Sequence, residues 1–264
     1  MPKIQVHPVT IPKDKLDAAP EEERLTYLMA GNLANDLHIL QKLLIVSINT
    51  AHDMGEPHGL PANGMSMLLV KLLAGRLYEG WNWLRSGANS HLGMRLALDK
   101  TSEAWACYRE ITGYFGRDNL INALRQKIGF HSDVETMRQG YLLLAEQQMT
   151  ELIAEQRGNT FYGSADITSL GALCHLVKED DVARALGTIA DEVARVANLF
   201  GDLVVHIAVQ FCMDVLDIDA KKQLEQVLEI DAPRLDELRF PFFADGMPKD
   251  VAEVVADIAE PPAA

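Results

Sequence analysis

The sequence of this 264-residue chain is short of cysteine, of basic residues and of long hydrophobic runs. Its three cysteines, Cys107, Cys174 and Cys212, are an odd number and lie far apart within apolar helical patterns. Such cysteines are typical of buried free thiols in a reducing compartment and do not indicate a disulfide framework. No apolar run approaches the roughly 20 residues of a membrane-spanning helix, and the first residues contain no apolar signal-peptide core. We therefore expect a soluble, cytoplasmic protein without a membrane segment.

The deficit of basic residues limits what the chain can bind. There are 24 Lys and Arg against 38 Asp and Glu, for a formal net charge of -14. Since phosphate contacts come from patches of Lys and Arg, this balance argues against broad, non-specific binding of nucleic acid. The chain also lacks a glycine-rich phosphate loop, a Gly-x-Ser-x-Gly elbow and a Cys-x-x-Cys pair, and we expect no cofactor. Basic residues nevertheless cluster in one part of the sequence: Arg109, Arg117, Arg125, Lys127 and Arg138.

Helical periodicity is the strongest pattern that the sequence contains. Apolar residues recur at spacings of three and four in residues 21–49, 65–84 and 100–115 and in a long final helix, whereas strand patterns are nearly absent. The first helix has the stripe Leu33, Leu37, Leu40, Leu44 and Ile48. The last has Leu186, Ile189, Val193, Val196, Phe200, Leu203, Ile207 and Phe211. The sequence therefore predicts an all-α protein built as a helical bundle.

The chain divides into three expected regions. Residues 1–20 are a polar, extended lead-in, in which prolines prevent a helix. Residues 21–218 form a single helical domain, whose inner helices we expect to be capped by Asp118 and Asp180. Residues 219–264 form an acidic tail with short helices.

A loop rich in Gly and Pro is expected at residues 51–64. It contains two histidines and two acids, His52, Asp53, Glu56 and His58, an assortment that could bind a metal ion. Short acidic and imidazole side chains also collect in loops simply because they cap helices and face water. Ligands on such a segment would lack rigid support, so the loop is the lesser alternative and no metal is expected in the main site.

An arginine and a histidine are separated by five residues in the segment 124–133, LRQKIGFHSD. Its apolar positions recur at helical spacing. After Asp133 the helix either continues or restarts, with Asp133 as a possible cap, and we expect it to run to about Gln156. On an ideal helix Arg125 and His131 are roughly 9 Å apart along the axis and about 120° apart around it. They cannot form a tight intrahelical pair, but both can face a groove or a cleft shared with a second copy. Gly129, between them, loosens the helix.

This segment resembles the Arg-x(4–6)-His signature of the HEPN superfamily of helical proteins, many of which are metal-independent ribonucleases. The resemblance covers about residues 21–155 and extends to the upstream helix LLVKLLAGRLYEGWNWL. It implies a HEPN-like bundle and a composite active site at a homodimer interface. The helices that periodicity predicts at 156–218 are additional to that bundle. The chain departs from the superfamily at Gln126, where Asn, Asp or His is frequent, and in its C-terminal hundred residues.

The resemblance implies that Arg125 holds the scissile phosphate and that His131 transfers protons. Ser132 or Asp133 would position them, RNA would be the substrate, and a cognate antitoxin protein could control a toxin or phage-defence activity. On the upstream helix, Arg76 and Glu79 are three residues apart and favour an intrahelical ion pair. Alternatively, Glu79 orients Arg125 or His131 from a facing helix.

A non-enzymatic alternative also fits the sequence. Arg125 could form a structural salt bridge to Glu79 or Asp118, and His131 could be a helix-end histidine bonded to backbone. The chain would then be a non-catalytic helical dimerisation or binding module of the same fold, with a partner protein, a nucleotide or RNA as its ligand.

Overall fold

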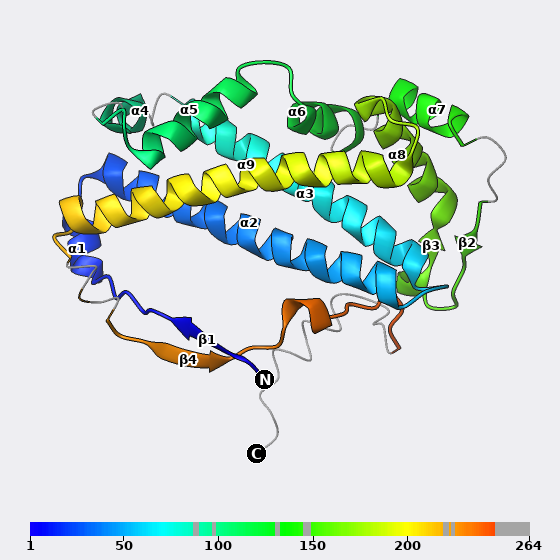
Figure 1. The fold of residues 1–264 in the computed structure, drawn as a ribbon, viewed down its shortest axis with the longest axis horizontal. Coiled ribbons are helices and arrows are strands. Elements are labelled where there is room, and N and C mark those ends of the chain that lie inside the picture. The colour runs from blue at the N-terminus through cyan, green and yellow to red at the C-terminus, as the bar shows by residue number, and fades with distance from the viewer. Residues whose placement is uncertain are drawn as a thin grey trace.

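A computed structural model describes residues 1–86, 90–96, 99–129, 133–144, 149–218, 222 and 225–245 of the chain. Its centre is a set of long helices, α2 (Glu21–Asp53), α3 (Gly59–Leu84) and α9 (Val182–Gln210), which pack on one another (Figure 1). About 70% of the protein is helical, which confirms the predicted all-α bundle.

Helix α9 is buried along the face that its sequence predicts. Ile189, Val196, Phe200 and Leu203 are all fully buried, and Phe200 lies at the centre of the main hydrophobic core. The segment Arg184–Val215 comprises most of α9 and the π-helical turn that follows it. By length and composition this segment is apolar enough to cross a membrane, contrary to the sequence analysis. The core helix of a soluble bundle passes the same test, so the finding is weak evidence for a membrane segment.

Helix α2 begins at Glu21, as predicted, directly after Pro20, and it has three acids in its first turn, where the helix dipole favours them. Its buried face differs from the expected stripe toward the C-terminal end, where Val46 and Thr50 are buried and Ile48 is 47% exposed. A helix with 3.6 residues per turn drifts relative to a fixed row of apolar residues, so a stripe extrapolated over 33 residues leaves the core.

Shorter helices form a layer over the long ones (Figure 1). They are α4 (Ser90–Leu96), α5 (Glu103–Phe115), α6 (Leu120–Leu124), α7 (Val134–Leu142) and α8 (Gly163–Val177). Two expected N-caps are off by one residue, because Asn119 rather than Asp118 caps α6 and Asp181 rather than Asp180 caps α9. Both actual caps accept a hydrogen bond from the backbone N–H three residues on, at 2.8 Å.

The predicted helix end near Gln156 is wrong, whereas the predicted alternative of a restart after Asp133 is confirmed. Helix α6 passes into a π-helical turn at Arg125–Gly129, and α7 ends at Leu142. Beyond it the chain forms a two-stranded antiparallel pair, β2 (Glu151–Leu152) and β3 (Phe161–Tyr162), with a 3-10 turn at 157–159 between them.

Helices α7 and α8 cross at very short distance because each has a glycine at the crossing. A Cβ atom added to Gly140 would lie 2.3 Å from the backbone nitrogen of Ala172, and one added to Gly171 would lie 2.3 Å from the carbonyl oxygen of Gly140. Only residues without a side chain allow this approach, which helps to fix the position of α7 after the π turn.

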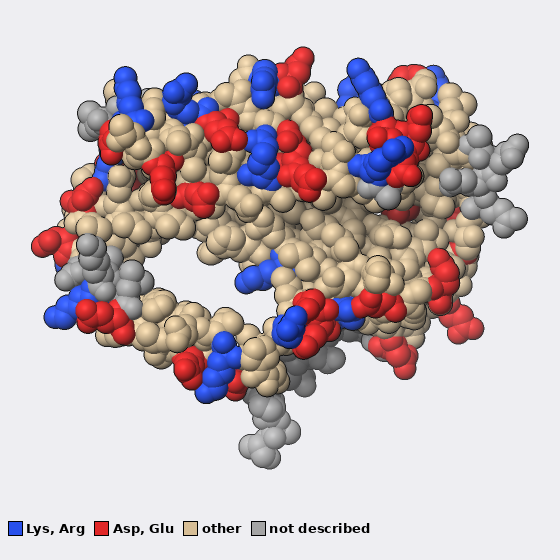
Figure 2. All heavy atoms as spheres, in the orientation of Figure 1, with Lys and Arg blue, Asp and Glu red and all other residues tan. Residues whose placement is uncertain are grey.

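The two terminal regions are paired with each other, which the sequence did not reveal. Strand β1 (Lys3–Val6) lies antiparallel to β4 (Leu228–Asp231), with Lys3 opposite Asp231. This ribbon stands away from the helices, and Figure 2 shows an opening between them. The lead-in also contains a helix, α1 (Lys13–Ala18), contrary to prediction, because it fits between Pro12 and Pro20 without including either.

The C-terminal region then returns to the end of α2 in a 3-10 turn, Leu235–Glu237. The Asn49 amide donates to the carbonyl of Leu235, and the backbone N–H of Phe240 donates to Thr50 Oγ1 at 2.8 Å. This part of the expected tail is therefore attached to the bundle, while residues 246–264 lie outside the described residues.

Candidate functional site

The π-helical turn Arg125–Gly129 is anchored by buried apolar side chains. Ile121 and Leu124 in α6 are fully buried, and Ile128 within the turn is 7% exposed. The backbone N–H of Ile121 donates to the Tyr114 hydroxyl at 3.4 Å, which ties α6 to α5. The buried residues direct one side of the turn inward, so Arg125 lies half-buried at its edge.

Arg125 contacts two consecutive residues of α3. Its guanidinium carbon lies 4.4 Å from the centre of the Tyr78 ring, a cation–π distance, and its Nη2 lies 3.4 Å from Glu79 Oε1. The Arg125 side chain is 27% exposed and that of Glu79 is 49% exposed. The contact fits both interpretations from the sequence, since a structural salt bridge and an orienting carboxylate share this geometry.

The expected intrahelical pair between Arg76 and Glu79 does not form. Arg76 Nη2 instead pairs with Asp36 Oδ2 of α2 at 2.7 Å, while Glu79 pairs with Arg125. Each side chain finds a partner on a neighbouring helix, and spacing along one helix cannot reveal such partners.

Asp133 lies at the start of α7 and contacts the π turn. Its carboxylate accepts from Thr136 Oγ1 and pairs with Lys127 Nζ at 3.1 Å, and its backbone N–H donates to the carbonyl of Lys127. The hydrogen bond from Thr136 and the ammonium of Lys127 hold the pKa of Asp133 below its usual value. Asp133 occupies the N-cap position of α7, as the sequence suggested, whereas His131 and Ser132 lie outside the described residues.

A half-buried acid and base near the π turn were missed by the sequence analysis. Burial lowers the pKa of Lys71 on α3 and raises that of Asp166 on α8, and the charge of each partly offsets the burial of the other. A Cβ atom added to Gly129 would lie 3.7 Å from the Cβ of Lys71. The signal was present, because Lys71 interrupts the apolar run LLVKLL.

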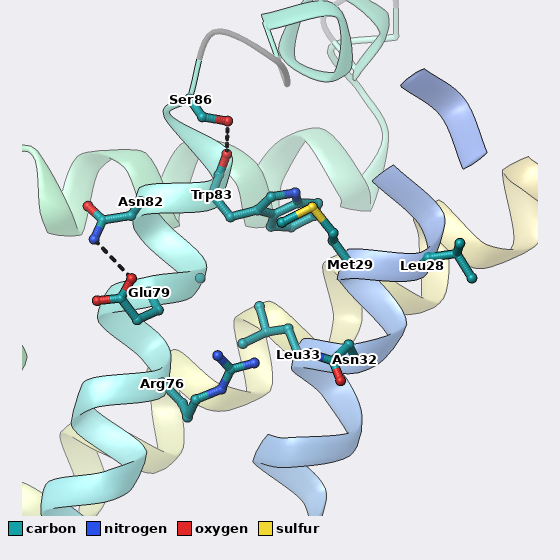
Figure 3. Close-up of a pocket in the computed structure, with 10 residues that line it drawn as sticks. Leu28, Met29, Asn32, Leu33, Arg76, Glu79, Asn82, Trp83 and Ser86 are labelled. Atoms are coloured by element: carbon teal, nitrogen blue, oxygen red, sulfur yellow. Dashed lines mark hydrogen bonds between the residues drawn. The ribbon is translucent and has the colours of Figure 1, made fainter. Parts of the chain in front are cut away.

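A pocket of about 540 Å³ lies between α2 and α3, beside Glu79. Figure 3 shows Arg76 and Trp83 projecting from α3 toward α2, from which Met29 and Leu33 face them. Glu79 and Asn82 form the other flank, where the Asn82 amide donates to Glu79 Oε2 at 3.4 Å. Glu79 therefore belongs to both the wall of the pocket and the contact with Arg125.

The predicted metal-binding loop does not gather its four residues into a site. Helix α2 runs to Asp53 and α3 begins at Gly59, so the loop shrinks to residues 54–58. Asp53 is engaged by His52 and by Arg239, which lower its pKa in that order, and the His58 ring packs edge-on against Phe243. Among the described residues, no group of three or more His, Cys, Asp or Glu is placed to hold a metal ion.

Comparison of the chain with protein-family models, with curated proteins and with solved structures finds no match. The likeness to the HEPN superfamily therefore remains a prediction that rests on residues 124–133 and the helix upstream. The structure itself defines the class of protein: an all-α helical bundle in which a π-helical turn presents an arginine beside a pocket.

Proposed function

We propose that this protein is a metal-independent endoribonuclease that uses Arg125 and His131. The observation that supports it is the setting of Arg125, which the π turn holds against the Tyr78 ring with one long ion pair to Glu79. A planar, permanently charged guanidinium suits the phosphate of RNA, and among the described residues only its Nη2 has a hydrogen-bond partner. His131 lies two residues after the last residue of the turn in the sequence.

The proposed reaction needs no metal. The RNA 2'-oxygen attacks the adjacent phosphorus as a base removes its proton, and the 5'-oxygen leaves with a proton from an acid, producing a 2',3'-cyclic phosphate. Histidine suits the proton transfers because its unperturbed pKa is about 6.5. Arginine offsets the charge that develops on the phosphorane. Two histidines, one from each protomer, can serve as base and acid in a single step.

A homodimer is part of this proposal. Five large apolar side chains of α2 are exposed and share one helical face, interrupted by Asn32 and Asp36: Leu25, Leu28, Met29, Ile39 and Leu43. Exposed apolar residues that gather on one face are typical of protein interfaces. We name these five residues the α2 stripe and propose that a second copy covers it.

The test is cleavage of a mixed-sequence single-stranded RNA in the presence of EDTA. Wild type should cleave and leave cyclic-phosphate ends, while His131→Ala and Arg125→Ala should each lose at least about 100-fold in rate. Circular dichroism and gel filtration must first show that both variants keep their fold and oligomeric state. Folded wild type that leaves every RNA intact, or variants that cleave normally, would contradict the proposal.

A second candidate is a non-catalytic helical module that binds a partner protein. The specific observation in its favour is the Glu79 carboxylate, which pairs with Arg125 and partly neutralises it. Acidic and basic side chains are also interspersed over the face in Figure 2, with no broad basic surface there. This candidate predicts a stable complex, for instance with a cognate antitoxin, and no cleavage of RNA by the folded protein.

A further inference from the structure

The pocket between α2 and α3 combines aromatic and apolar walls with polar groups that lack partners. Arg76 Nε and Asn82 Oδ1 are both buried and, within the part of the chain that the structure describes, have no hydrogen-bond partner. A buried polar atom without a partner is costly, and a ligand that supplies the missing bond recovers that cost. Arg76 Nε is a donor on the side of α3 that faces α2, so the ligand must carry an acceptor there, whereas Asn82 projects from the other flank of α3 (Figure 3).

The shape of the pocket favours a flat ligand. Trp83 and Met29 project toward each other from opposite walls, and Leu33 lies between the two helices (Figure 3). Trp83 is 8% exposed, so only an edge of its indole borders the pocket, whereas Met29 is 51% exposed and adapts to a ring because its side chain is unbranched and polarizable. The pocket volume of about 540 Å³ is in the range of known small-molecule sites and accommodates a nucleoside.

The position of the pocket relates it to Arg125. Glu79 is the common wall: its Oε1 faces the Arg125 guanidinium and its Oε2 accepts from Asn82. A ligand whose ring lies in the pocket and whose anionic group lies on the far side of Glu79 would contact both the pocket and Arg125. A nucleotide unit of single-stranded RNA has this build, with a heteroaromatic base that accepts hydrogen bonds and a phosphate attached through the ribose.

We propose that the pocket holds one unstacked base of a single-stranded RNA next to the phosphate bound by Arg125. The base packs against Met29 and the accessible edge of the Trp83 ring, and it accepts a hydrogen bond from Arg76 Nε. All four RNA bases carry an acceptor that Arg76 Nε can satisfy, so we expect binding of each nucleoside monophosphate. This inference rests on the proposed ribonuclease function for its substrate, but base binding can be measured without cleavage.

The experiment measures binding of a fluorescent 2'-O-methyl oligoribonucleotide, which cannot be cleaved because its 2'-oxygen is blocked, and competition by the four nucleoside monophosphates. Met29→Trp fills the pocket from its exposed side, and Arg76→Lys keeps the charge opposite Asp36 but removes Nε. Each should weaken binding about five- to tenfold, the range for one stacking contact or one hydrogen bond. Met94→Trp, a replacement of an exposed methionine on α4, is the matched control and should leave affinity unchanged.

The outcomes separate this inference from the ribonuclease proposal. Unchanged affinity in both pocket variants, or no binding of oligonucleotide and monophosphates by wild type, overturns the base pocket even if RNA is cleaved. Weakened binding in both variants supports the pocket even if no RNA is cleaved, in which case only the ribonuclease proposal fails. Since Met29 also belongs to the α2 stripe, gel filtration accompanies each titration. A Met29→Trp protein that changes oligomeric state while Arg76→Lys binds normally would assign the pocket to a subunit interface and overturn the inference.

Discussion

Arg125 and Arg195 lie in two different regions of the molecule and have neighbours of the same kinds, a tyrosine ring and glutamate. They differ in the number and length of their ion pairs. Each guanidinium carbon lies over a tyrosine ring, at 4.4 Å from Tyr78 for Arg125 and at 5.2 Å from Tyr114 for Arg195. Arg195 forms a 2.7 Å ion pair with Glu110 and a second, at 3.4 Å, with Glu192. Among the described residues, Arg125 has a single carboxylate partner, at 3.4 Å.

The difference separates a structural arginine from one that can bind a ligand. Arg195 uses three of its nitrogens in hydrogen bonds and links α9 to α5. Within the part of the chain that the structure describes, Arg125 uses only Nη2, in its ion pair with Glu79, which leaves most of its planar fork for an anion such as phosphate. A salt bridge by itself therefore does not assign a role to an arginine; how many of its donors the protein satisfies is more informative.

The largest expected effect comes from removing the rings beneath the two arginines. Tyr114 is 5% exposed and packs edge-on against Phe115, so Tyr114→Ala should lower the free energy of unfolding by about 3–5 kcal/mol. Tyr78 is only half-buried, and Tyr78→Ala should lower it by about half as much. Urea denaturation measures both values. Equal losses at the two positions would remove the distinction between a structural and an accessible arginine.

A smaller effect is expected when each arginine is replaced by lysine. Lysine keeps the charge but loses the planar fork, so Arg125→Lys should reduce RNA cleavage about 10- to 100-fold, the value of one charge-assisted hydrogen bond. Arg195→Lys is the matched control and should cleave like wild type, with a change in unfolding free energy within about 1 kcal/mol. Initial rates on the same RNA measure the first effect. A similar loss of cleavage in both variants would mean that neither arginine is specifically involved.

The all-α class and the long helices followed from periodicity because burial of an apolar face largely determines helix position. The start of α2 and the buried face of α9 were therefore correct, since both depend on residues within one helix. Partners on other helices could not be read in this way. Spacing favoured Arg76 with Glu79, whereas packing pairs Arg76 with Asp36 and Glu79 with Arg125.

The motif region illustrates the same limit. Gly129 was expected to loosen the helix, and the structure has a π turn that ends at Gly129 and a new helix that begins after Asp133. Ile128 of the turn is buried, and the close crossing of α7 and α8 at Gly140 and Gly171 positions the helix that follows. Both are contacts between helices, which spacing along one helix does not reveal. The pocket beside Glu79 was also beyond the sequence, since its walls come from two helices whose crossing sets its width.

The smallest effect concerns Asp133, which supports the turn that carries Arg125. Its pKa is lowered in the folded protein, so its ionised form contributes stability above its unfolded pKa of about 3.9, and that contribution is lost as the pH falls through the folded pKa. Asp133→Asn should therefore melt at a lower temperature than wild type at neutral pH, because it loses the ion pair with Lys127. The difference between the two proteins should shrink on acidification and vanish once Asp133 is protonated in the wild type. Thermal unfolding of both proteins across the acidic range measures this, and a difference that stays constant with pH would exclude the carboxylate charge as its cause.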